Sequence, residues 1–267
     1  MKNIMLEVKN LFCGYNVQAI LRDINFTVKS GEIISIIGPN GSGKTTLLKA
    51  ISNVLKPEKG EILLEGKPLA KIHRKDLARK LAVVNQTVAP VFMTVEEYVL
   101  LGRMPYYRQF QLFETKKDID LAEYYMKRTD ILSQKNTPMT EISGGERQLA
   151  SIARALVQEP ELLLLDEPTS HLDITHQAQI LDLIAQLNKE LGLTVILVMH
   201  DLNLASEYSH RLVLVNGSTG SIYKTGVPAE VLTHTSINDV YKTRVIINEN
   251  PISNKPYIIL SKDIANS

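Results

Sequence analysis

An octapeptide near the N-terminus constrains the fold and the chemistry of this chain more than any other feature. Gly38-Pro39-Asn40-Gly41-Ser42-Gly43-Lys44-Thr45 matches the pattern G-x-x-x-x-G-K-[ST] at every fixed position. The apolar run Ile33–Ile37 precedes it, and Thr46–Ile51 continues it as a helix-forming segment. A strand, a glycine loop and a helix start in this order predict a phosphate-binding loop. We therefore expect the chain to bind a nucleoside triphosphate.

The residue types of this loop suit phosphate together with a magnesium ion. Glycine lets the backbone curl so that several N–H groups point at one anion, and the helix N-terminus adds its positive dipole end. Lys44 is expected to reach the β- and γ-phosphates, and the hydroxyl of Thr45 to hold Mg²⁺. Mg²⁺ is thus the cofactor that the sequence predicts, bound together with the nucleotide.

Composition argues against several other kinds of protein. A net charge of +1 in 267 residues gives no reason to expect a nucleic-acid partner or a surface for anionic lipids. Cys13 is the only cysteine, so no disulfide framework is expected and a reducing compartment fits. No stretch approaches 18 consecutive apolar residues. We expect a cytoplasmic protein that reaches a membrane only by docking onto another subunit.

Strand-like and helix-like segments alternate, which predicts an α/β fold with a mainly parallel sheet. Strands are expected, in chain order, at 4–8, 24–28, 61–65, 81–86, 161–166, 193–199 and 212–215. Helices are expected at 45–55, 116–132 and 175–191, and a last pair of strands around 251–260. Between about 89 and 139 strand-like runs are missing, and Thr94 with Glu97 has the spacing of a capping box. This segment is predicted to be a helical insert.

Two carboxylates end one of the most apolar strands. In Leu162-Leu163-Leu164-Leu165-Asp166-Glu167 the leucines indicate a strand that is covered on both faces, so Asp166 lies where the chain leaves the core. Ligands of doubly wound sheets bind at this end of the strands. Asp166 is placed to hold Mg²⁺, directly or through water, and Glu167 to polarise an attacking water as general base.

A second glycine pair precedes an amphipathic helix. Ser143-Gly144-Gly145-Glu146 comes shortly before Leu149–Leu156, whose apolar residues recur at helical spacing. A helix start of this kind is either an ordinary cap or a site for an anion. Two adjacent glycines are more than a cap requires, and a second phosphate-facing helix has no use within one monomer.

Taken in order, these motifs resemble those of the ATP-binding subunits of ABC transporters, over nearly the whole chain. Gly38–Thr45 is similar to the Walker A loop, Leu162–Glu167 to the Walker B strand, and Ser143–Gln148 to the signature, with Ile142 and Glu146 where leucine and glutamine are usual. The resemblance implies a phosphate-loop core with a mainly parallel sheet, an N-terminal antiparallel β subdomain and an inserted α-helical subdomain. It implies one domain over 1–267, with a core of 1–88 and 141–267 and a helical insert of 89–140.

The resemblance also implies a role for each site residue. The residues implied to bind ATP are Tyr15, which would stack on adenine, and Gly38, Pro39, Asn40, Gly41, Ser42, Gly43, Lys44, Thr45 and Thr46. Those implied in catalysis are Lys44, Gln86, Glu167 and His200, and those implied to hold Mg²⁺ are Thr45, Gln86 and Asp166. Asp173 would act in the D-loop at a dimer seam. Simpler alternatives stay open: packing for Tyr15, a solvated loop for Gln86, a strand end for His200 and a helix N-cap for Asp173.

In this family two copies pack head to tail around two ATP molecules. The resemblance implies that Ser143, Gly144, Gly145 and Glu146 of one copy complete the ATP site of the other. Closure would then complete the cage around the γ-phosphate, and hydrolysis would release it. The implied partners are ATP, a second copy of this subunit, integral membrane permease subunits and a substrate-binding protein. The chain would be peripheral on the inner face of the membrane.

Finer features resemble the group that serves importers of ferric siderophores, haem and cobalamin. These features include Thr94–Val99, Gly102–Tyr106, Glu167–Gln177 and His200–Ala205. They imply ATP hydrolysis that energises uptake of a metal chelate through a separate permease. Importers of molybdate or tungstate share the architecture and remain an alternative. So do soluble ABC ATPases that act in iron–sulfur assembly, on ribosomes or on DNA.

Overall fold

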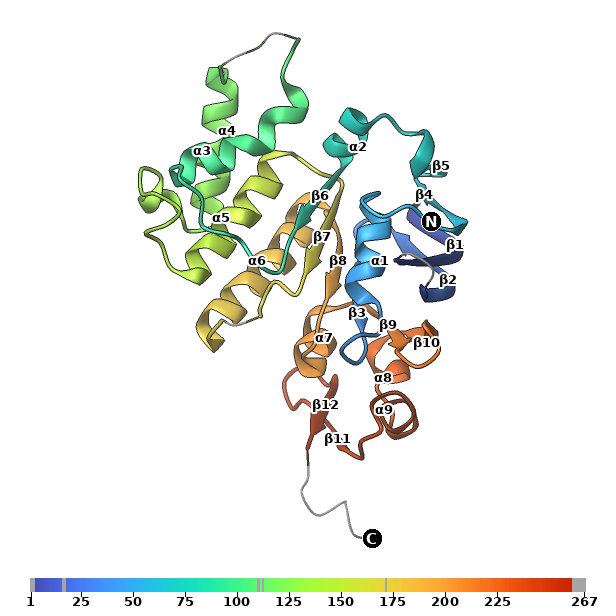
Figure 1. Cartoon of the computed structure of the whole chain (residues 1–267). Coiled ribbons are helices and arrows are strands. Elements are labelled where there is room, and N and C mark those ends of the chain that lie inside the picture. Colours follow the sequence, from blue (N-terminus) through green and yellow to red (C-terminus); the bar gives the residue numbers. More distant parts are fainter. Residues whose placement is uncertain (1–2, 16–17, 110, 112, 171, 261–267) are drawn as a thin grey trace. The chain divides into compact units, whose positions relative to one another are not determined.

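The computed structural model describes residues 3–15, 18–109, 111, 113–170 and 172–260 (Figure 1). The chain forms two compact units. The first unit combines Met1–Lys71 with Thr194–Ser267, and the second unit is Ile72–Leu193. Each unit is described below by itself. Within the described residues, no helix has both the length and the hydropathy to cross a bilayer.

The first unit contains a sheet whose central strands are parallel. Strand β3 (Ile33–Ile37) pairs in parallel with β8 (Thr194–Val198) on one side and with β9 (Arg211–Asn216) on the other. Strand β10 (Ser221–Gly226) adds to β9 in antiparallel orientation. Every residue of β3 and β8 is buried, as expected for strands covered on both faces. Helix α1 (Lys44–Ile51) follows β3, and α7 (Leu202–Tyr208) follows β8 (Figure 1).

A second sheet of the first unit is antiparallel throughout, in the order β2-β1-β4-β5. Its strands are β1 (Ile4–Tyr15), β2 (Gln18–Lys29), β4 (Lys59–Leu64) and β5 (Lys67–Pro68), followed by the short 3₁₀ helix η1 (Leu69–Lys71). Strands β1 and β2 are far longer than the two alternating segments predicted from the sequence. Their pairing contains several register shifts, which interrupt the period-2 pattern and hide the full strand length from the sequence.

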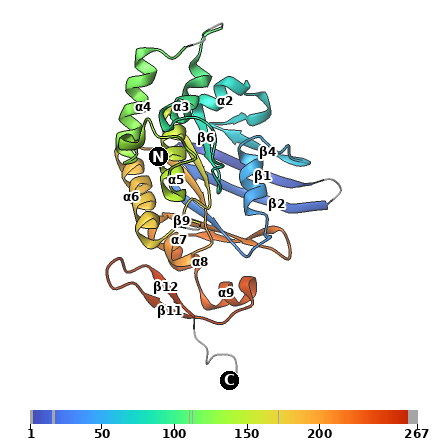
Figure 2. The ribbon, with the colours of Figure 1, turned by 60° about the vertical axis from the view of Figure 1, so that its left-hand side comes forward.

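The C-terminal part of the first unit holds two short helices and a hairpin. Helices α8 (Pro228–Val231) and α9 (His234–Tyr241) lead into strands β11 (Ile246–Glu249) and β12 (Pro256–Ile259). The Asn203 amide on α7 donates to the carbonyl oxygen of Ile258 and accepts from its N–H, so the hairpin lies against α7 (Figure 2). The hairpin begins earlier than the 251–260 predicted from the sequence.

The second unit contains two parallel strands, β6 (Leu81–Val84) and β7 (Leu162–Asp166), which pair residue by residue from Leu81 with Leu162 to Val84 with Leu165. Its larger helices are α2 (Arg74–Lys80), α4 (Lys116–Arg128), α5 (Gly144–Val157) and α6 (Ile174–Leu191). These parallel strands, together with those of the first unit and its antiparallel N-terminal strands, confirm the predicted α/β fold class.

The stretch from 89 to 140 has helices and no strand among its described residues. It contains α3 (Val95–Leu100), the 3₁₀ helices η2 (Leu101–Tyr106) and η3 (Leu132–Gln134), and α4. The predicted capping box at Thr94 and Glu97 is confirmed, because both reciprocal hydrogen bonds are present. Helix α4 ends at Arg128, before the predicted Leu132, since Asp130 has a left-handed φ of 57°.

The segment after α3 is fastened to the C-terminal end of α5. A Cβ at Gly102 would lie 2.1 Å from the carbonyl oxygen of Arg154, so only glycine fits there. The next residue, Arg103, is buried and donates to the buried carboxylate of Asp118 and to the carbonyl oxygen of Val157. Because no side chain separates residue 102 from α5, the two backbones lie in direct contact.

Candidate nucleotide-binding site

The phosphate-binding loop has the strand, loop and helix context that the sequence predicts. Strand β3 ends at Ile37, and α1 begins at Lys44 with Gly43 as its N-cap. Gly43 has a φ of 93°, and a Cβ there would lie 2.7 Å from the Leu21 Cδ2 atom. Gly38 has a φ of 155°, and a Cβ there would lie 2.5 Å from the carbonyl oxygen of Val215 on β9. Glycine is therefore required at both positions for conformation and for space.

Lys44 lies folded over this loop. Its side chain is only about 5% exposed, and Nζ donates to the carbonyl oxygens of Gly38 at 2.9 Å and Pro39 at 3.0 Å. Burial of an ammonium group is costly unless hydrogen bonds compensate for it. The two carbonyl contacts hold the charge at the loop, where it suits a bound phosphate. Thr45 is half-buried and Thr46 is buried in the same first turn of α1.

Two further predicted residues lie in the first unit. Tyr15 is the last residue of β1 and is 43% exposed, with Lys49 Nζ 5.8 Å from its ring centroid. A partly exposed aromatic ring suits stacking on a flat base. His200 follows β8 after the buried Met199 and is exposed. Asp201 next to it caps α7 through the N–H groups of Asn203 and Leu204.

The predicted carboxylates lie at the C-terminal end of β7 in the second unit. Asp166 is the last strand residue, and Glu167 follows it with a left-handed φ of 48°. A non-glycine residue in this conformation carries strain, and such residues cluster at functional sites. Glu167 is only 9% exposed although it is a carboxylate. The backbone turn thus directs a buried acid away from the strand.

Gln86 and Ser170 both donate hydrogen bonds to Glu167. The Gln86 Nε2 atom lies 2.6 Å from Oε2 of Glu167, and the Ser170 Oγ atom lies 3.0 Å from the same oxygen. Gln86 follows β6, whose parallel pairing with β7 brings the two strand ends to one edge. The sequence predicted Gln86 and Glu167 as site residues but missed Ser170. The interval of three residues between Ser170 and Glu167 was the signal that would have found it.

The glycine pair of the second unit forms the start of α5. Ser143 is the N-cap, and it exchanges both capping-box hydrogen bonds with Glu146. The N–H of Ser143 is the largest cause that holds the pKa of the Glu146 carboxyl below its usual range. Ser143 and Gly144 are exposed, whereas Gly145 is buried. The capping role is confirmed, and binding of an anion at this helix start stays a prediction.

Asp173 caps the next helix in the same way. Its Oδ1 atom accepts from the N–H of His176 at 2.9 Å, at the start of α6. This hydrogen bond is the largest cause that lowers the pKa of Asp173. Its side chain is 65% exposed, so a carboxylate faces outward beside the helix start. The N-cap role is confirmed, and the Oδ2 atom of the same carboxylate lies 2.9 Å from Nδ1 of the His176 ring.

The predicted site residues thus fall into two groups, one in each unit. The first unit brings together the phosphate loop, with Lys44, Thr45 and Thr46 in the first turn of α1, and it also carries Tyr15 and His200. The second unit carries the remaining predicted residues, which are Gln86, Ser143, Gly144, Gly145, Glu146, Asp166, Glu167 and Asp173.

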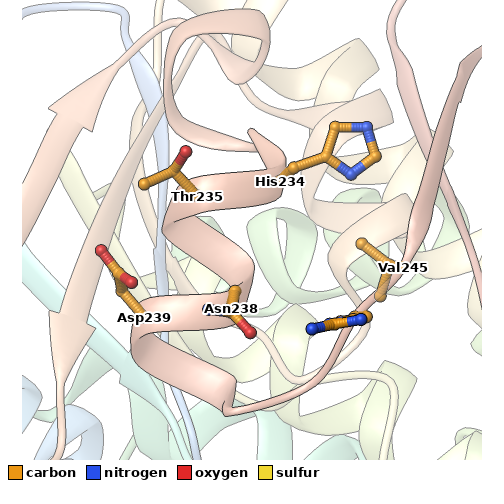
Figure 3. A pocket seen from close by; sticks show the side chains of 6 residues that line it. His234, Thr235, Asn238, Asp239 and Val245 are labelled. Atoms are coloured by element: carbon orange, nitrogen blue, oxygen red, sulfur yellow. The ribbon is translucent and has the colours of Figure 1, made fainter. Parts of the chain in front are cut away.

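One surface pocket includes none of these residues. It has a volume of about 410 Å³ and is lined by α9 and the segment after it (Figure 3). Its lining residues are His234, Thr235, Asn238, Asp239, Arg244 and Val245. The pocket therefore adds nothing to the nucleotide site proper.

Comparison with known proteins agrees with the motifs. Residues 21–170 match the family model described as "ABC transporter". The iron(3+)-hydroxamate import ATP-binding protein FhuC of Bacillus subtilis (strain 168) is 38% identical over 260 residues, which cover 97% of this chain and 95% of the relative.

Two solved structures are similar in fold. An inward-facing putative metal-chelate type ABC transporter gives a TM-score of 0.83 at 27% identity, over 96% of this chain and 97% of that chain. A dimeric post-hydrolysis state of the ATP-binding cassette MJ0796, bound to ADP and Pi, gives 0.73 at 28% identity, over 84% of this chain and 98% of that one. With a family model over more than half its length and a relative that matches almost end to end, this phosphate-loop protein belongs to the ABC transporter family and is one of its ATPases.

Proposed function

We propose that the chain is the ATP-hydrolysing subunit of an importer that takes up a metal chelate, such as a ferric siderophore, haem or cobalamin. The observation that carries this proposal is the near end-to-end similarity to a protein named for iron(3+)-hydroxamate import. The similarity to a metal-chelate type transporter over 96% of the chain supports it independently. The buried acid of the second unit supplies the group that hydrolysis needs.

In this proposal Lys44 and the loop residues from Gly38 to Thr46 hold the triphosphate of ATP, and Tyr15 stacks on the adenine. Lys44 already lies at the loop, so it neutralises phosphate charge with little rearrangement. Glu167 accepts the proton of the attacking water. Gln86 orients the Glu167 carboxylate through the 2.6 Å hydrogen bond. His200 contacts the γ-phosphate.

The residues proposed to hold Mg²⁺ have the right donor chemistry. Thr45 offers a hydroxyl oxygen, Asp166 a carboxylate and Gln86 an amide oxygen, and Mg²⁺ prefers oxygen ligands. Because a carboxylate only accepts, the Gln86 amide nitrogen faces Glu167, which leaves the amide oxygen for the ion. When bound, Mg²⁺ would neutralise charge on the phosphate oxygens.

We further propose that two copies of the chain close around two ATP molecules. Ser143, Gly144, Gly145 and Glu146 of one copy would meet the ATP on the other copy's loop, and Asp173 would act at the seam. The exposed helix start at Ser143 supports this, since N–H groups of a first turn attract an anion. The dimeric form of a similar cassette supports it as well.

A mixing experiment tests this shared site. A Lys44→Ala variant and a Ser143→Arg/Gly145→Arg variant should each be inactive alone. Mixed together they should regain part of the phosphate release, because a mixed pair contains one intact composite site. A mixture as inactive as its components, although both variants are folded and form mixed pairs, would overturn the shared site.

The importer proposal includes partners and a place in the cell. Residues 89–140 would form a helical subdomain that docks, together with the surface near Gln86, onto integral permease subunits at the inner face of the membrane. A substrate-binding protein would deliver the chelate.

Co-purification of the permease, its reconstitution, and a screen of loaded binding proteins test this importer proposal directly. Stimulation of ATP turnover by a ferric siderophore, haem or cobalamin supports the proposal, and stimulation by molybdate or tungstate selects that importer class instead. A chain that finds no permease and is stimulated by ribosomes, DNA or iron–sulfur scaffold proteins would be a non-transport ATPase.

A further inference from the structure

His176 lies between the two loops of the second unit that the proposed function places at the dimer seam. It belongs to the first turn of α6, and its side chain is 36% exposed. Its Nδ1 atom is 2.9 Å from Oδ2 and 3.0 Å from Oδ1 of Asp173. Since a carboxylate only accepts, Nδ1 carries the proton and donates it to this contact. The imidazole is therefore held at one edge by the D-loop carboxylate.

The opposite edge of the same ring faces the signature glycine. A Cβ at Gly145 would lie 2.7 Å from Cδ2 and 3.1 Å from Nε2 of His176. That is closer than real Cβ atoms come, so the ring occupies the space that a side chain at 145 would need. Gly145 has an ordinary φ, unlike the glycines of the phosphate loop, so it is the ring and not the backbone conformation that limits the room for a side chain at this position.

Charge links His176 to the signature as well. The Glu146 carboxyl, whose pKa lies below its usual range chiefly through the Ser143 N–H, is lowered further by attraction to His176. Glu146 stands where glutamine is usual, so this chain has a second carboxylate, besides Asp173, whose charge is attracted to the imidazole. Both carboxylates also cap helices, α5 and α6, so the ring connects two helix starts.

We propose that His176 is a positioning residue that fixes the D-loop carboxylate of Asp173 and the first turn of α5 as one unit, so that a protomer presents both to its partner together. The inference rests on the proposed two-copy mechanism. In this role His176 acts through Asp173 and Gly145, which it contacts. It acts by removing the freedom of two loops that otherwise order separately when the pair closes, and ordering side chains on association costs free energy.

The test uses the full chain with Glu167→Gln as the parent, because that change is expected to trap the ATP-bound pair. Three variants are added to the parent: His176→Ala removes both contacts of the ring, His176→Asn keeps a donor near Nδ1, and Thr175→Ala changes an exposed residue of the same helix turn. Sedimentation velocity gives the protein concentration at which half of the chain is paired in ATP. Calorimetry on dilute, unpaired chain gives ATP affinity, and thermal melting reports the fold.

We expect His176→Ala to raise the half-pairing concentration about tenfold, the effect of a coupling near 1.4 kcal/mol. His176→Asn should recover most of this loss, and Thr175→Ala should match the parent. ATP affinity of the unpaired chain should stay the same in all variants. The double variant His176→Ala/Asp173→Ala should have nearly the same half-pairing concentration as Asp173→Ala alone, because both substitutions break the same His176–Asp173 contact.

Different failures separate the two proposals. If the parent does not pair in ATP, the proposed two-copy mechanism is wrong, and this inference falls with it. If the parent pairs and His176→Ala pairs equally well, only the positioning role is overturned. It is also overturned if His176→Ala lowers ATP affinity and melting temperature in proportion to the loss of pairing, since that pattern marks a general structural role.

Discussion

The side-chain amide of Gln86 donates a 2.6 Å hydrogen bond to Oε2 of Glu167. This contact joins the second residue after β6 to the first residue after β7, and it holds the acid in the orientation that its left-handed backbone sets. Glu167→Gln should therefore keep ATP binding and lower phosphate release by about 10²–10⁴-fold, the usual contribution of a general base. Phosphate release under saturating ATP and calorimetry give the two quantities.

Ser170→Ala is the matched control for this change, because it removes a contact to the same oxygen and leaves the acid in place. It should lower turnover far less than Glu167→Gln. Turnover of the Glu167→Gln protein at the parent rate would remove Glu167 from the role of general base.

Lys44→Ala should weaken nucleotide binding itself. The buried ammonium group lies on the loop that is proposed to hold the triphosphate, and a hydrogen bond to a charged group contributes about 1.5–3 kcal/mol. We expect the dissociation constant of ATP, measured by calorimetry, to rise about tenfold to a hundredfold. Lys59→Ala on β4 is the control for the loss of a positive charge, and it should leave the dissociation constant of ATP unchanged. Equal affinities in parent and Lys44→Ala would contradict the phosphate-loop assignment.

Tyr15→Ala should cost affinity for adenine and not for phosphate. The ring is 43% exposed, and stacking of aromatic rings contributes about 0.5–1.5 kcal/mol. ATP should bind about two- to tenfold more weakly, while inorganic tripolyphosphate should bind as before. Tyr15→Phe keeps the ring and should behave like the parent in both titrations. An equal loss for ATP and tripolyphosphate would show that Tyr15 supports the fold of the loop instead.

Arg103→Met should destabilise the second unit, because it leaves the buried carboxylate of Asp118 without its guanidinium. Breaking a buried ion pair by removing one partner costs about 3–5 kcal/mol of the free energy of unfolding. Urea unfolding at pH 7 measures this, with the exposed Arg108→Met as control. A change within the error of the control would mean that the pair contributes nothing to stability.

The same pair gives a pH dependence with a definite sign. Burial raises the pKa of Asp118, but hydrogen bonds from Thr115 and Arg103 outweigh it, so the pKa lies below its ordinary value of 3.8. A depressed folded pKa contributes stability above the unfolded pKa, and this stability is lost as pH falls through the folded pKa. In Arg103→Met the pKa of Asp118 rises, and protonation at low pH removes the buried, unpaired charge that destabilises the variant. The difference in unfolding free energy between parent and variant should shrink below about pH 4.

Much of the fold could be predicted because its signals are local. The phosphate loop, the apolar run ending at Asp166 and the capping box at Thr94 each lie within a few residues, and the structure confirms all three. The full lengths of β1 and β2 could not be predicted, since register shifts disrupt the period-2 pattern. Helix α2 was missed because its seven residues are too few and too charged for a clear periodicity.

Side-chain contacts between distant residues escaped the sequence for another reason. Gln86 and Glu167 were both predicted as site residues, but only the parallel pairing of β6 and β7 brings them within 2.6 Å. Arg103 was noted within Gly102–Tyr106 without a contact, and its partners, Asp118 and the Val157 carbonyl, depend on how three helices pack. Such contacts follow from tertiary geometry, which no short pattern encodes.

The backbone contact at Gly102 has a mechanical consequence. Between most packed helices, the intervening side chains can take up small shifts by changing rotamer. At Gly102 no side chain intervenes, and the backbone lies directly against the carbonyl oxygen of Arg154. We therefore expect a displacement of this segment, which carries the exposed Met104, to reach the C-terminal end of α5 directly. Because Ser143 caps the opposite end of the same helix, we expect such a displacement to reach the glycine pair through one continuous element.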